Sequence, residues 1–350
     1  MAEFSKWLKT KRLSWQKPAS SESLKIKILL IRLSSIGDIV LTSPIVRMIK
    51  NQVEGAEIHF LTKKNFQFIL LQNPYIDKVH AYDGNMQETL TQLKQESFDY
   101  LIDLHHNIRT ARIRAALKVP SNTFHKLNWA KFLKVNFKID LLPPVHIVDR
   151  YCEAASHFSL TNDQQGLDFF YPPEEAFPVS QLPEGFQAGF AVFVIGGQHA
   201  TKRLPNEQIA AIIQELNYPV ILLGGKDDVP NASVLEQELG SRIVNLCGQI
   251  SLFASASLVK EAQFVISHDT GLMHIAAAFK KKIISIWGNT IPEFGMTPYL
   301  SDPDSFQSEV KNLSCRPCSK IGFDTCPKKH FKCMREQNIA QIITVARRWM

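Results

Sequence analysis

The chain has 350 residues, 45% of them hydrophobic and 21% charged, which is typical of a soluble globular protein with one or two domains. No apolar run approaches the roughly 20 residues of a membrane span and no signal peptide is recognisable, so we expect a cytoplasmic protein. The net charge of +7 and the pI of about 9.0 favour an acidic partner such as phosphate groups or an anionic membrane surface, whereas the absence of nucleic-acid-binding motifs argues against nucleic acid.

Residues 1–24 are predicted to be a basic N-terminal extension. Lysines and arginines alternate there with apolar side chains such as Phe4 and Trp7. Such a segment has two interpretations. It rests on an anionic bilayer, or it is a solvated extension without fixed structure.

The stretch IRLSSIGDIVLTSP, residues 31–44, predicts the end of a strand, a tight turn and a helix. A single carboxylate, Asp38, follows Gly37 at this turn. The stretch is neither GxGxxG nor GxxxxGK[ST], which argues against an NAD-dependent redox protein and against a P-loop. Asp38 is therefore either a helix cap or a functional carboxylate.

Short apolar runs alternate with helical patterns through the first half of the chain. Strands are predicted at 27–33, 57–62, 79–82 and 99–105, and helices at 43–53, 64–72 and 86–96. This alternation is typical of βαβ units around a parallel sheet. Residues 160–187, which are rich in proline and polar side chains, are interpreted as a linker.

The alternation resumes after the linker. Strands are predicted at 190–197, 218–225, 242–248, 263–269 and 283–289, and helices at 206–216, 251–262 and 270–279. We therefore predict two α/β halves with a cleft between them. Ligands of parallel sheets bind beyond the carboxyl ends of the strands, so Asp38 is expected to point into that cleft.

The stretch ISHDTGLMHIAAA predicts a strand that ends at Asp269 and a helix that follows Thr270 and Gly271. The N-terminus of a helix presents unpaired N–H groups and a partial positive charge, which together favour an anion. The alternative is an ordinary strand-to-helix turn with Asp269 as a cap. His274 either touches a phosphate or sugar, or is a packed histidine of the core.

Four of the six cysteines lie close together in the sequence CRPCSKIGFDTCPKKHFKC. They are Cys315, Cys318, Cys326 and Cys333. Four thiols can hold a structural zinc ion, although this spacing is not that of a standard zinc ribbon. The alternative is a set of packed thiols that brace a loop.

Four stretches in chain order carry a specific resemblance: LLIRLSSIGDIVLTSPIVRMIK, GGQHATKRLPNEQIAAII, LLGG and SHDTGLMHIAAAFKKKIISIWG. They resemble glycosyltransferase family 9, the lipopolysaccharide heptosyltransferases. The resemblance implies a GT-B fold with two Rossmann-like domains facing across a cleft, an acceptor domain at 25–180 and a nucleotide-sugar domain at 185–350. It implies inverting transfer of heptose from ADP-heptose to a glycolipid acceptor, the lipid A–core, with no cofactor and no catalytic metal.

The resemblance also assigns roles to individual residues. Asp38 matches the proposed base that takes the proton of the acceptor hydroxyl, and Lys202 matches a lysine that contacts the phosphates. Other donor-site candidates are Thr201, Asp269, Thr270, Gly271, Leu272 and His274. Acceptor-side candidates after the fourth strand are Asp103, which is a reserve base, His105, His106 and Arg109.

Two departures from the family pattern leave the donor open. Family members commonly place an acid after LLGG that helps to hold the nucleoside, whereas this chain has Lys226, Asp227 and Asp228 there. The segment TKRLP lacks an aromatic residue that many relatives have before the proline. The alternatives are a relative that uses another nucleotide sugar and a module that binds a nucleotide sugar without turnover.

Overall fold

The computed structural model describes residues 25–350, and the predicted basic extension at 1–24 lies outside the described residues. The chain forms two compact units, neither of which is one continuous stretch. Of the described residues, the first unit contains 25–34, 45–124 and 151–162, and the second contains 35–44, 125–150 and 163–350. The domain boundaries predicted at 25–180 and 185–350 stay a prediction.

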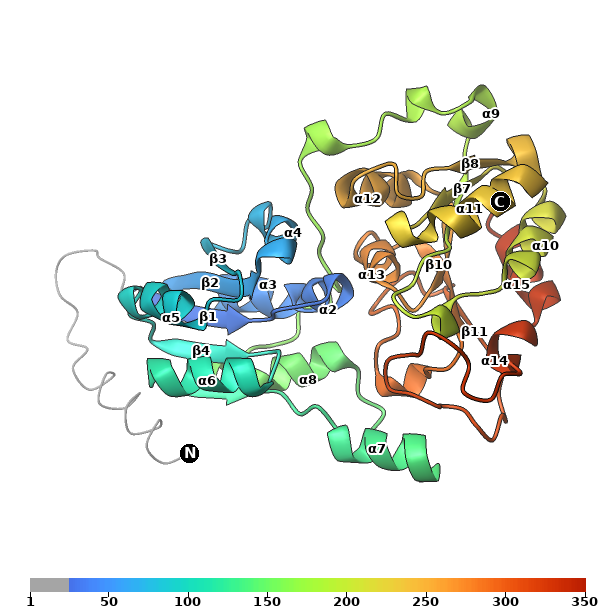
Figure 1. Ribbon diagram of the computed structural model, residues 1–350. Coiled ribbons are helices and arrows are strands. Elements are labelled where there is room, and N and C mark those ends of the chain that lie inside the picture. Colours follow the sequence, from blue (N-terminus) through green and yellow to red (C-terminus); the bar gives the residue numbers. More distant parts are fainter. Residues whose placement is uncertain (1–24) are drawn as a thin grey trace. The chain divides into compact units, whose positions relative to one another are not determined.

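A five-stranded parallel sheet with the order β3-β2-β1-β4-β5 forms the centre of the first unit (Figure 1). Its strands are β1 (Ile26–Ile31), β2 (Ala56–Lys63), β3 (Lys78–Tyr82), β4 (Tyr100–Asp103) and β5 (Ser121–Thr123). Ile31 at the end of β1 pairs with Leu61 on one side and with Asp103 on the other. The strand order reverses at β1, and a sheet offers its ligand site at such a point.

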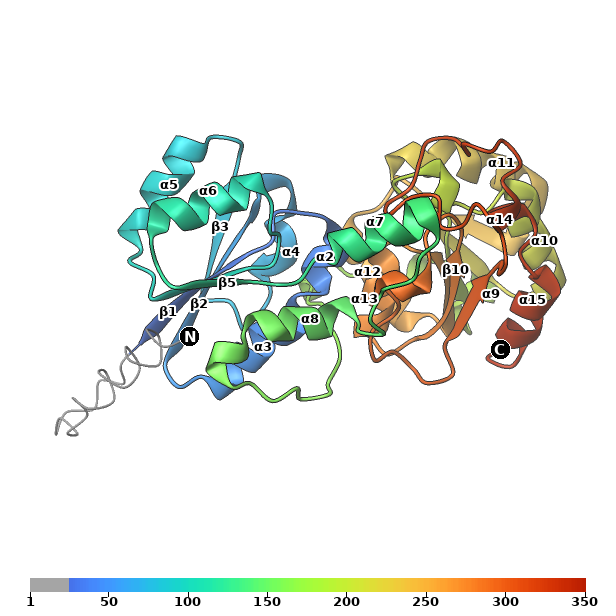
Figure 2. The same cartoon turned by 90° about the horizontal axis from the view of Figure 1, so that it is seen from below.

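Five helices of the described residues belong to this part of the chain; the first three lie within the predicted ranges 43–53, 64–72 and 86–96, and the last two were not predicted. They are α3 (Ser43–Gln52), α4 (Phe68–Leu71), α5 (Met86–Gln95), α6 (Ile108–Leu117) and α8 (Ile147–Ala154). Figure 2 shows α5 and α6 on one face of the sheet and α3 on the other. Helices on both faces bury the central strands β1 and β4, which explains why these strands read as apolar runs, whereas the edge strand β5, with the sequence SNT, is only partly buried.

A six-stranded parallel sheet with the order β11-β10-β9-β6-β7-β8 forms the centre of the second unit. Its strands are β6 (Ala191–Val194), β7 (Val220–Leu223), β8 (Ile243–Asn245), β9 (Phe264–His268), β10 (Lys282–Trp287) and β11 (Phe306–Glu309). The edge strand β11 was not predicted, because in its sequence, FQSE, only Ser308 is buried. The strand order reverses between β6 and β9, where Val194 pairs with Ser267.

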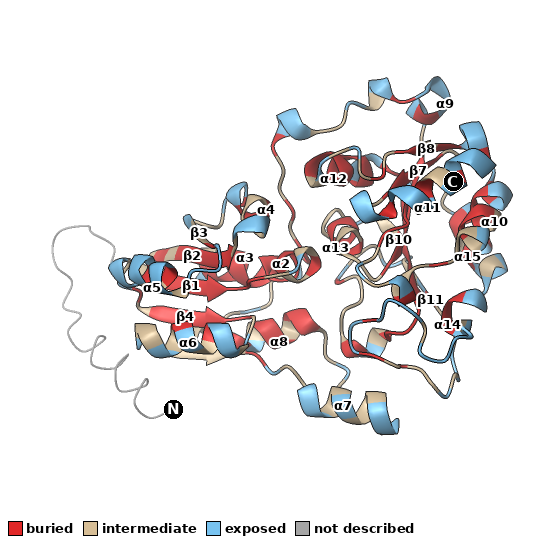
Figure 3. Ribbon diagram, viewed as in Figure 1, coloured by how far each residue is buried: buried red, intermediate tan, exposed pale blue. Residues whose placement is uncertain are grey.

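Helices in the second unit surround this sheet and the turns at its carboxyl edge. They are α2 (Ile36–Val40), α7 (Asn128–Phe137), α9 (Glu184–Gln187), α10 (Asn206–Leu216), α11 (Val229–Leu239), α12 (Leu252–Glu261), α13 (Gly271–Ala278), α14 (Lys332–Arg335) and α15 (Ile339–Arg347). The buried side chains gather on the strands and on the inner sides of these helices (Figure 3). Phe193, Leu222 and Ile284 of the sheet share one core with Ile209 of α10 and Ile342 of α15.

The predicted linker at 160–187 contains only short helices. These are two single-turn 3-10 helices, Pro173–Glu175 and Val179–Gln181, and the four-residue α9. Within residues 25–350, none of the helices is long and apolar enough to cross a bilayer.

Candidate functional site

Asp38 lies in the first turn of the short helix α2, directly after β1 and its loop. Its Oδ2 accepts hydrogen bonds from the backbone N–H of Ser35 at 3.2 Å and from the Ser35 hydroxyl at 3.0 Å. Ser35 is the N-cap of α2, so this is the reciprocal arrangement of a capping box. Asp38 therefore does cap α2, and both capping hydrogen bonds are accepted by the same carboxylate oxygen, Oδ2.

The loop before Asp38 is held from inside the first unit by Arg32. The guanidinium of this buried arginine donates to the carbonyls of Ser34 and Leu104 at 2.8 and 2.7 Å and to the Tyr151 hydroxyl at 3.0 Å. Leu104 directly follows β4, so Arg32 ties the carboxyl ends of the two neighbouring strands together. Because Arg32 lies within an apolar run, the sequence pattern did not predict this role.

Helix α2 packs directly on α13, and two glycines make the approach possible. A Cβ on Gly37 would lie 2.7 Å from the Cδ2 of His274, and a Cβ on Gly271 would lie 3.0 Å from the Cγ2 of Ile36. Any larger side chain at either position would push the helices apart. The motifs around Asp38 and Asp269 therefore form one packed contact within the second unit.

The turns that follow β6 and β9 bring Lys202 and Asp269 together. Lys202 ends a 3-10 turn, Ala200–Lys202, and its Nζ lies 2.5 Å from the Oδ2 of Asp269. The Thr290 hydroxyl donates to the same oxygen at 3.2 Å. Both partners of the ion pair are largely buried, which fixes the lysine head at the carboxyl edge of the sheet.

The N-terminus of α13 lies at the same edge. Thr270 is its N-cap in an extended conformation, and no side-chain capping bond forms there. The first N–H groups of α13, at Gly271 and Leu272, have no partner within the helix, because the first turn of any helix leaves them unpaired. The Thr270 hydroxyl lies 3.2 Å from that of Ser267. Lys202 and this helix start supply two kinds of donor for an anion.

His274 lies one turn into α13 and is almost fully buried. Burial lowers the pKa of His274 to about 4, against the opposing influence of the Asp269 and Asp38 carboxylates, so its imidazole is neutral at pH 7. Its Nδ1 is buried and has no hydrogen-bond partner within the described residues. His274 is thus a neutral ring that packs against Gly37 of α2, and the carboxylates of Asp38 and Asp269 both act on it electrostatically.

His268, which the sequence did not single out, holds the turns after β6 and β9 in place. Its Nε2 accepts from the backbone N–H of Leu204 at 2.9 Å, so the proton lies on Nδ1, which faces the carbonyl of Gly196 at 3.3 Å. This fully buried ring connects the ends of β6 and β9 to the segment after Lys202. In the sequence, the feature that could have indicated this role is that His268 directly precedes Asp269.

Of the two acids after LLGG, Asp228 is buried and Asp227 is exposed. Asp228 Oδ2 accepts from the backbone N–H of Gly225 at 2.8 Å, and its Oδ1 lies 3.4 Å from Arg203. The side chain also fills the space beside Gly196, where a Cβ would collide with the carboxylate. Asp228 is therefore the acid that reaches the edge shared by β6 and β7.

Thr201, whose role as a phosphate contact stays a prediction, is bonded to the Cys-rich segment. Its hydroxyl donates to the carbonyl of Phe323 at 3.0 Å and accepts from the N–H of Phe323 at 2.8 Å. The backbone N–H of Thr201 donates to the same carbonyl at 3.1 Å. Arg316 of the same segment donates to the carbonyls of Gly288 and Thr290. The segment thus braces the turns that carry Lys202 and Thr290.

Thr201→Val is expected to weaken ADP binding roughly tenfold, because the brace that positions Lys202 loses both hydroxyl bonds while the fold keeps its volume. Thr201→Ser keeps the hydroxyl and should bind nearly as the wild type does. Calorimetric titration of ADP measures both. If Thr201→Val binds ADP normally, the Phe323 contact does not position Lys202.

The acceptor-side candidates lie in the first unit, around the end of β4. Asp103 is fully buried; its Oδ1 accepts from the N–H groups of His105 and His106 at 3.0 and 2.7 Å, and its Oδ2 lies 3.7 Å from Arg114. This is a turn-forming carboxylate, an arrangement that disfavours its use as a reserve base. His106 and Arg109 are exposed, and His105 is half-buried.

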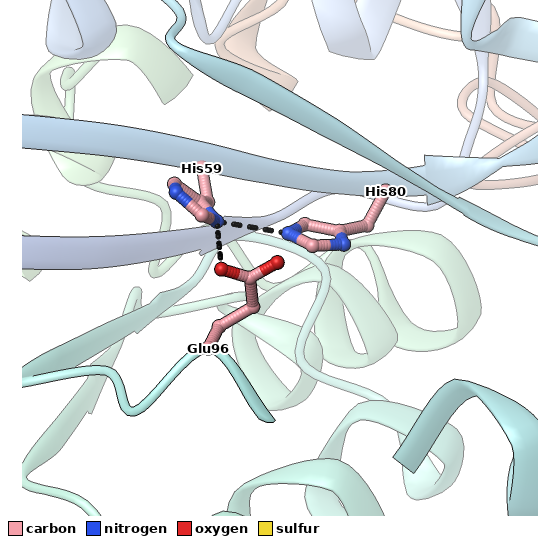
Figure 4. A group of neighbouring side chains, drawn as sticks. All are labelled: His59, His80 and Glu96. Carbon is pink, nitrogen blue, oxygen red and sulfur yellow. Dashed lines mark hydrogen bonds and ion pairs between the residues drawn. The ribbon is translucent and has the colours of Figure 1, made fainter. Parts of the chain in front are cut away.

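A separate histidine cluster lies in the first unit on β2, β3 and the end of α5 (Figure 4). His59 Nδ1 and His80 Nε2 are 2.9 Å apart, and Glu96 Oε2 is 3.9 Å from His59. Glu96 already pairs with Lys78 at 2.5 Å and Lys27 at 3.5 Å. The two ring nitrogens lie at hydrogen-bond distance, and the Glu96 carboxylate is already paired with two lysines. We therefore assign these three side chains to the core and not to a metal site.

Within residues 25–350, this cluster is the one place where three potential metal ligands approach within 4.8 Å of one another. The four thiols of the Cys-rich segment do not reach that spacing. None of the four forms a disulfide. As placed, they fit the loop-bracing interpretation better than a tetrahedral zinc site.

Acid is expected to destabilise the protein between about pH 6.5 and pH 4. Burial lowers the pKa of His80, His146, His268 and His274 to about 4. In this window the unfolded chain binds protons that the native state does not, so the free energy of unfolding falls as the pH falls. Each histidine contributes on the order of 1–3 kcal/mol.

Urea unfolding at a series of pH values measures this slope. His80→Gln removes one of these titrations and should flatten the slope by up to ~1.4 kcal/mol per pH unit, the value for one proton. His125→Gln, at an exposed position, is the control that should leave it unchanged. An equally steep slope in His80→Gln would mean that the pKa of His80 is not lowered in the native state.

Comparison with known proteins identifies relatives of this chain. The model of glycosyltransferase family 9 (heptosyltransferase) matches residues 86–325. Lipooligosaccharide heptosyltransferase 2 of Haemophilus influenzae is 24% identical over 306 residues, or 79% of this chain and 87% of that protein. A solved family 9 glycosyl transferase from Veillonella parvula has a TM-score of 0.73 at 20% identity, covering 94% of this chain and 99% of that one. Escherichia coli ADP-heptose lps heptosyltransferase II has a TM-score of 0.66 at 18% identity, covering 91% and 99%.

Proposed function

Because the chain belongs to glycosyltransferase family 9 and has the two parallel α/β sheets of the GT-B fold, we propose that it transfers heptose from ADP-heptose to a lipopolysaccharide inner-core acceptor. The observation that carries this proposal is the packing of α2 on α13. It puts Asp38 in the same compact unit as the Lys202–Asp269 pair and the start of α13. A base and an anion site are the two components that such a transfer requires.

In the proposed reaction, Asp38 takes the proton of the acceptor hydroxyl as that oxygen attacks the anomeric carbon of the donor. A new bond from the acceptor oxygen to this carbon forms while the bond to the diphosphate breaks, and attack from the opposite side inverts the configuration. The capping bonds from Ser35 to Asp38 Oδ2 fix the direction of the carboxylate. A fixed base needs no reorganisation when the proton moves.

The leaving ADP carries negative charge that protein groups must stabilise. Lys202 and the first N–H groups of α13 are the proposed donors, and Asp269 orients the lysine through their ion pair. These donors take the place of a metal ion, so we propose catalysis without one. Asp228 is the proposed contact for the nucleoside. The acceptor is a glycolipid, and we place the reaction on the cytoplasmic face of the inner membrane.

A thermal-shift panel of nucleotide sugars, measured in EDTA and followed by a transfer assay, tests the proposal. ADP-heptose should raise the melting temperature, since a ligand at about 100 times its Kd adds ~2.7 kcal/mol to the free energy of unfolding. Transfer should continue in EDTA. If only a UDP- or GDP-sugar raises the melting temperature, that sugar nucleotide is the donor and ADP-heptose is not. A raised melting temperature without turnover would indicate a binding module.

The same chelator distinguishes the two interpretations of the cysteines. With a loop-bracing segment, EDTA leaves the melting temperature unchanged and no zinc is found in the purified protein by elemental analysis. Loss of the fold in EDTA together with one equivalent of zinc would establish a structural metal at Cys315, Cys318, Cys326 and Cys333.

A further inference from the structure

Helix α7 (Asn128–Phe137) of the second unit has no buried residue, although its sequence, NWAKFLKVNF, is largely apolar. Figure 3 shows it without any of the red that marks buried residues on the neighbouring elements. A ten-residue helix is marginal in water by itself, and most helices gain their stability by packing an apolar face. In α7, Ala130, Leu133 and Val135 are only partly buried, and the three aromatic side chains are exposed.

The exposed side chains of α7 form one patch. Trp129 is 70% exposed, Phe137 62% and Phe132 43%. The rings of Trp129 and Phe132 stack with centroids 5.6 Å apart, and Phe132 meets Phe137 edge-on at 5.9 Å. Three neighbouring aromatic rings facing water mark an interaction surface rather than scattered surface residues.

The chain continues this patch just beyond the helix. Ile139 and Leu141 are 49% and 60% exposed. Lys138 anchors this end of the helix, because its Nζ donates to the carbonyls of Pro317 at 2.7 Å and Cys315 at 3.2 Å. The patch is therefore held in place on the second unit while its apolar side chains stay exposed.

The charge around the patch identifies its partner. Residues 125–141 contain four lysines (126, 131, 134 and 138) and one acid, Asp140, a difference of +3. Lys134 is paired with Asp140 at 2.6 Å and Lys138 is bonded to backbone carbonyls, so the segment contributes a net positive charge and not a row of free ammonium groups. A net positive charge beside exposed tryptophan and phenylalanine matches a bilayer with anionic head groups, where aromatic rings lie in the interface. A second copy of the chain would bring like charges together.

We propose that α7 and residues 138–141 form a docking surface for an anionic lipid bilayer. The proposal deepens the proposed function, because a lipid-linked acceptor lies in such a bilayer. Lys131 of α7 lies 5.4 Å from the Phe294 ring centroid, so this side of the helix faces the second unit and not solvent.

Vesicle co-flotation of the full chain, without any substrate, tests the docking surface. Wild type should bind vesicles of phosphatidylcholine with about 30% phosphatidylglycerol and bind pure phosphatidylcholine far more weakly, with salt weakening the former. The triple variant Trp129→Ser, Phe132→Ser, Phe137→Ser should lose at least tenfold in binding. Val234→Ser, which removes an apolar side chain that is 51% exposed on α11, is the matched control and should bind normally.

A second measurement follows Trp129 directly. Its fluorescence should shift to shorter wavelength on anionic vesicles, and Trp129→Phe should remove most of that shift while binding persists. Because the fluorescence change reports local burial, it distinguishes a docked helix from a variant that has simply unfolded. Unchanged melting temperatures of the variants confirm that they are folded.

Three outcomes would overturn the proposal. The first is that the triple variant binds vesicles as the wild type does. The second is that vesicle binding is lost when Phe4 and Trp7 of the N-terminal extension are replaced with serine and not when the α7 side chains are. The third is that the wild type binds no vesicles and that the triple variant abolishes a dimer. Vesicle binding without heptosyl transfer would refute the proposed function but leave the docking surface standing.

Discussion

Asp38→Asn is expected to lower kcat by roughly 100- to 10,000-fold while the affinity for the donor stays nearly unchanged. The asparagine amide cannot accept the proton of the acceptor hydroxyl, but its oxygen can still accept the two hydrogen bonds from Ser35 that Asp38 Oδ2 accepts now. The fold of α2 and its packing on α13 should therefore persist. Steady-state kinetics with an acceptor for heptose measure kcat, and calorimetric titration of ADP measures the affinity for the donor nucleotide.

Ser35→Ala is the matched control for this experiment. It removes the hydroxyl bond to Asp38 but leaves the carboxylate, so it should cost about 0.5–2 kcal/mol of stability and reduce kcat far less than Asp38→Asn does. If Asp38→Asn keeps kcat near the wild-type value and both variants lose stability alike, Asp38 is only a cap. The base would then have to be sought among the acceptor-side residues.

Lys202→Ala is expected to weaken ADP binding about 10- to 100-fold and also to slow the chemical step. A charge-assisted contact of this kind is worth about 1.5–3 kcal/mol, and its attraction grows as the leaving group gains negative charge. The structure adds a second reason. Without Lys202, the largely buried carboxylate of Asp269 would face the phosphates with no ion-pair partner and would repel them.

Calorimetric titration of ADP at low and high salt measures this contribution. Salt should weaken ADP binding by the wild type more than by Lys202→Ala, because only the wild type has that charge to screen. Lys311→Ala, at a lysine whose side chain is 76% exposed, is the matched control and should bind ADP normally. Equal low-salt affinities of wild type and Lys202→Ala would place Lys202 outside the site and leave Arg203 or the start of α13 as the main phosphate contact.

The fold could be predicted well because its signals are local. Strands of a doubly covered parallel sheet are buried on both faces, so β1, β6, β7 and β9 read as apolar runs wherever they occur. The edge strands β5 and β11 could not be predicted in this way, since their sequences are mostly polar. The family was recognisable for the same local reason, as its motifs lie in the turns directly after strands.

The sequence by itself determined which residues lie at the carboxyl ends of the strands, among them Asp38, Lys202, Asp269 and Thr270, because a strand followed by a turn is a local pattern. Only the tertiary structure decided which of them meet. Lys202 pairs with Asp269 across 67 residues of chain, His268 ties two turns together, and Thr201 bonds to Phe323. Such contacts depend on strand order and on close approaches at glycines such as Gly37 and Gly271, which no local pattern records.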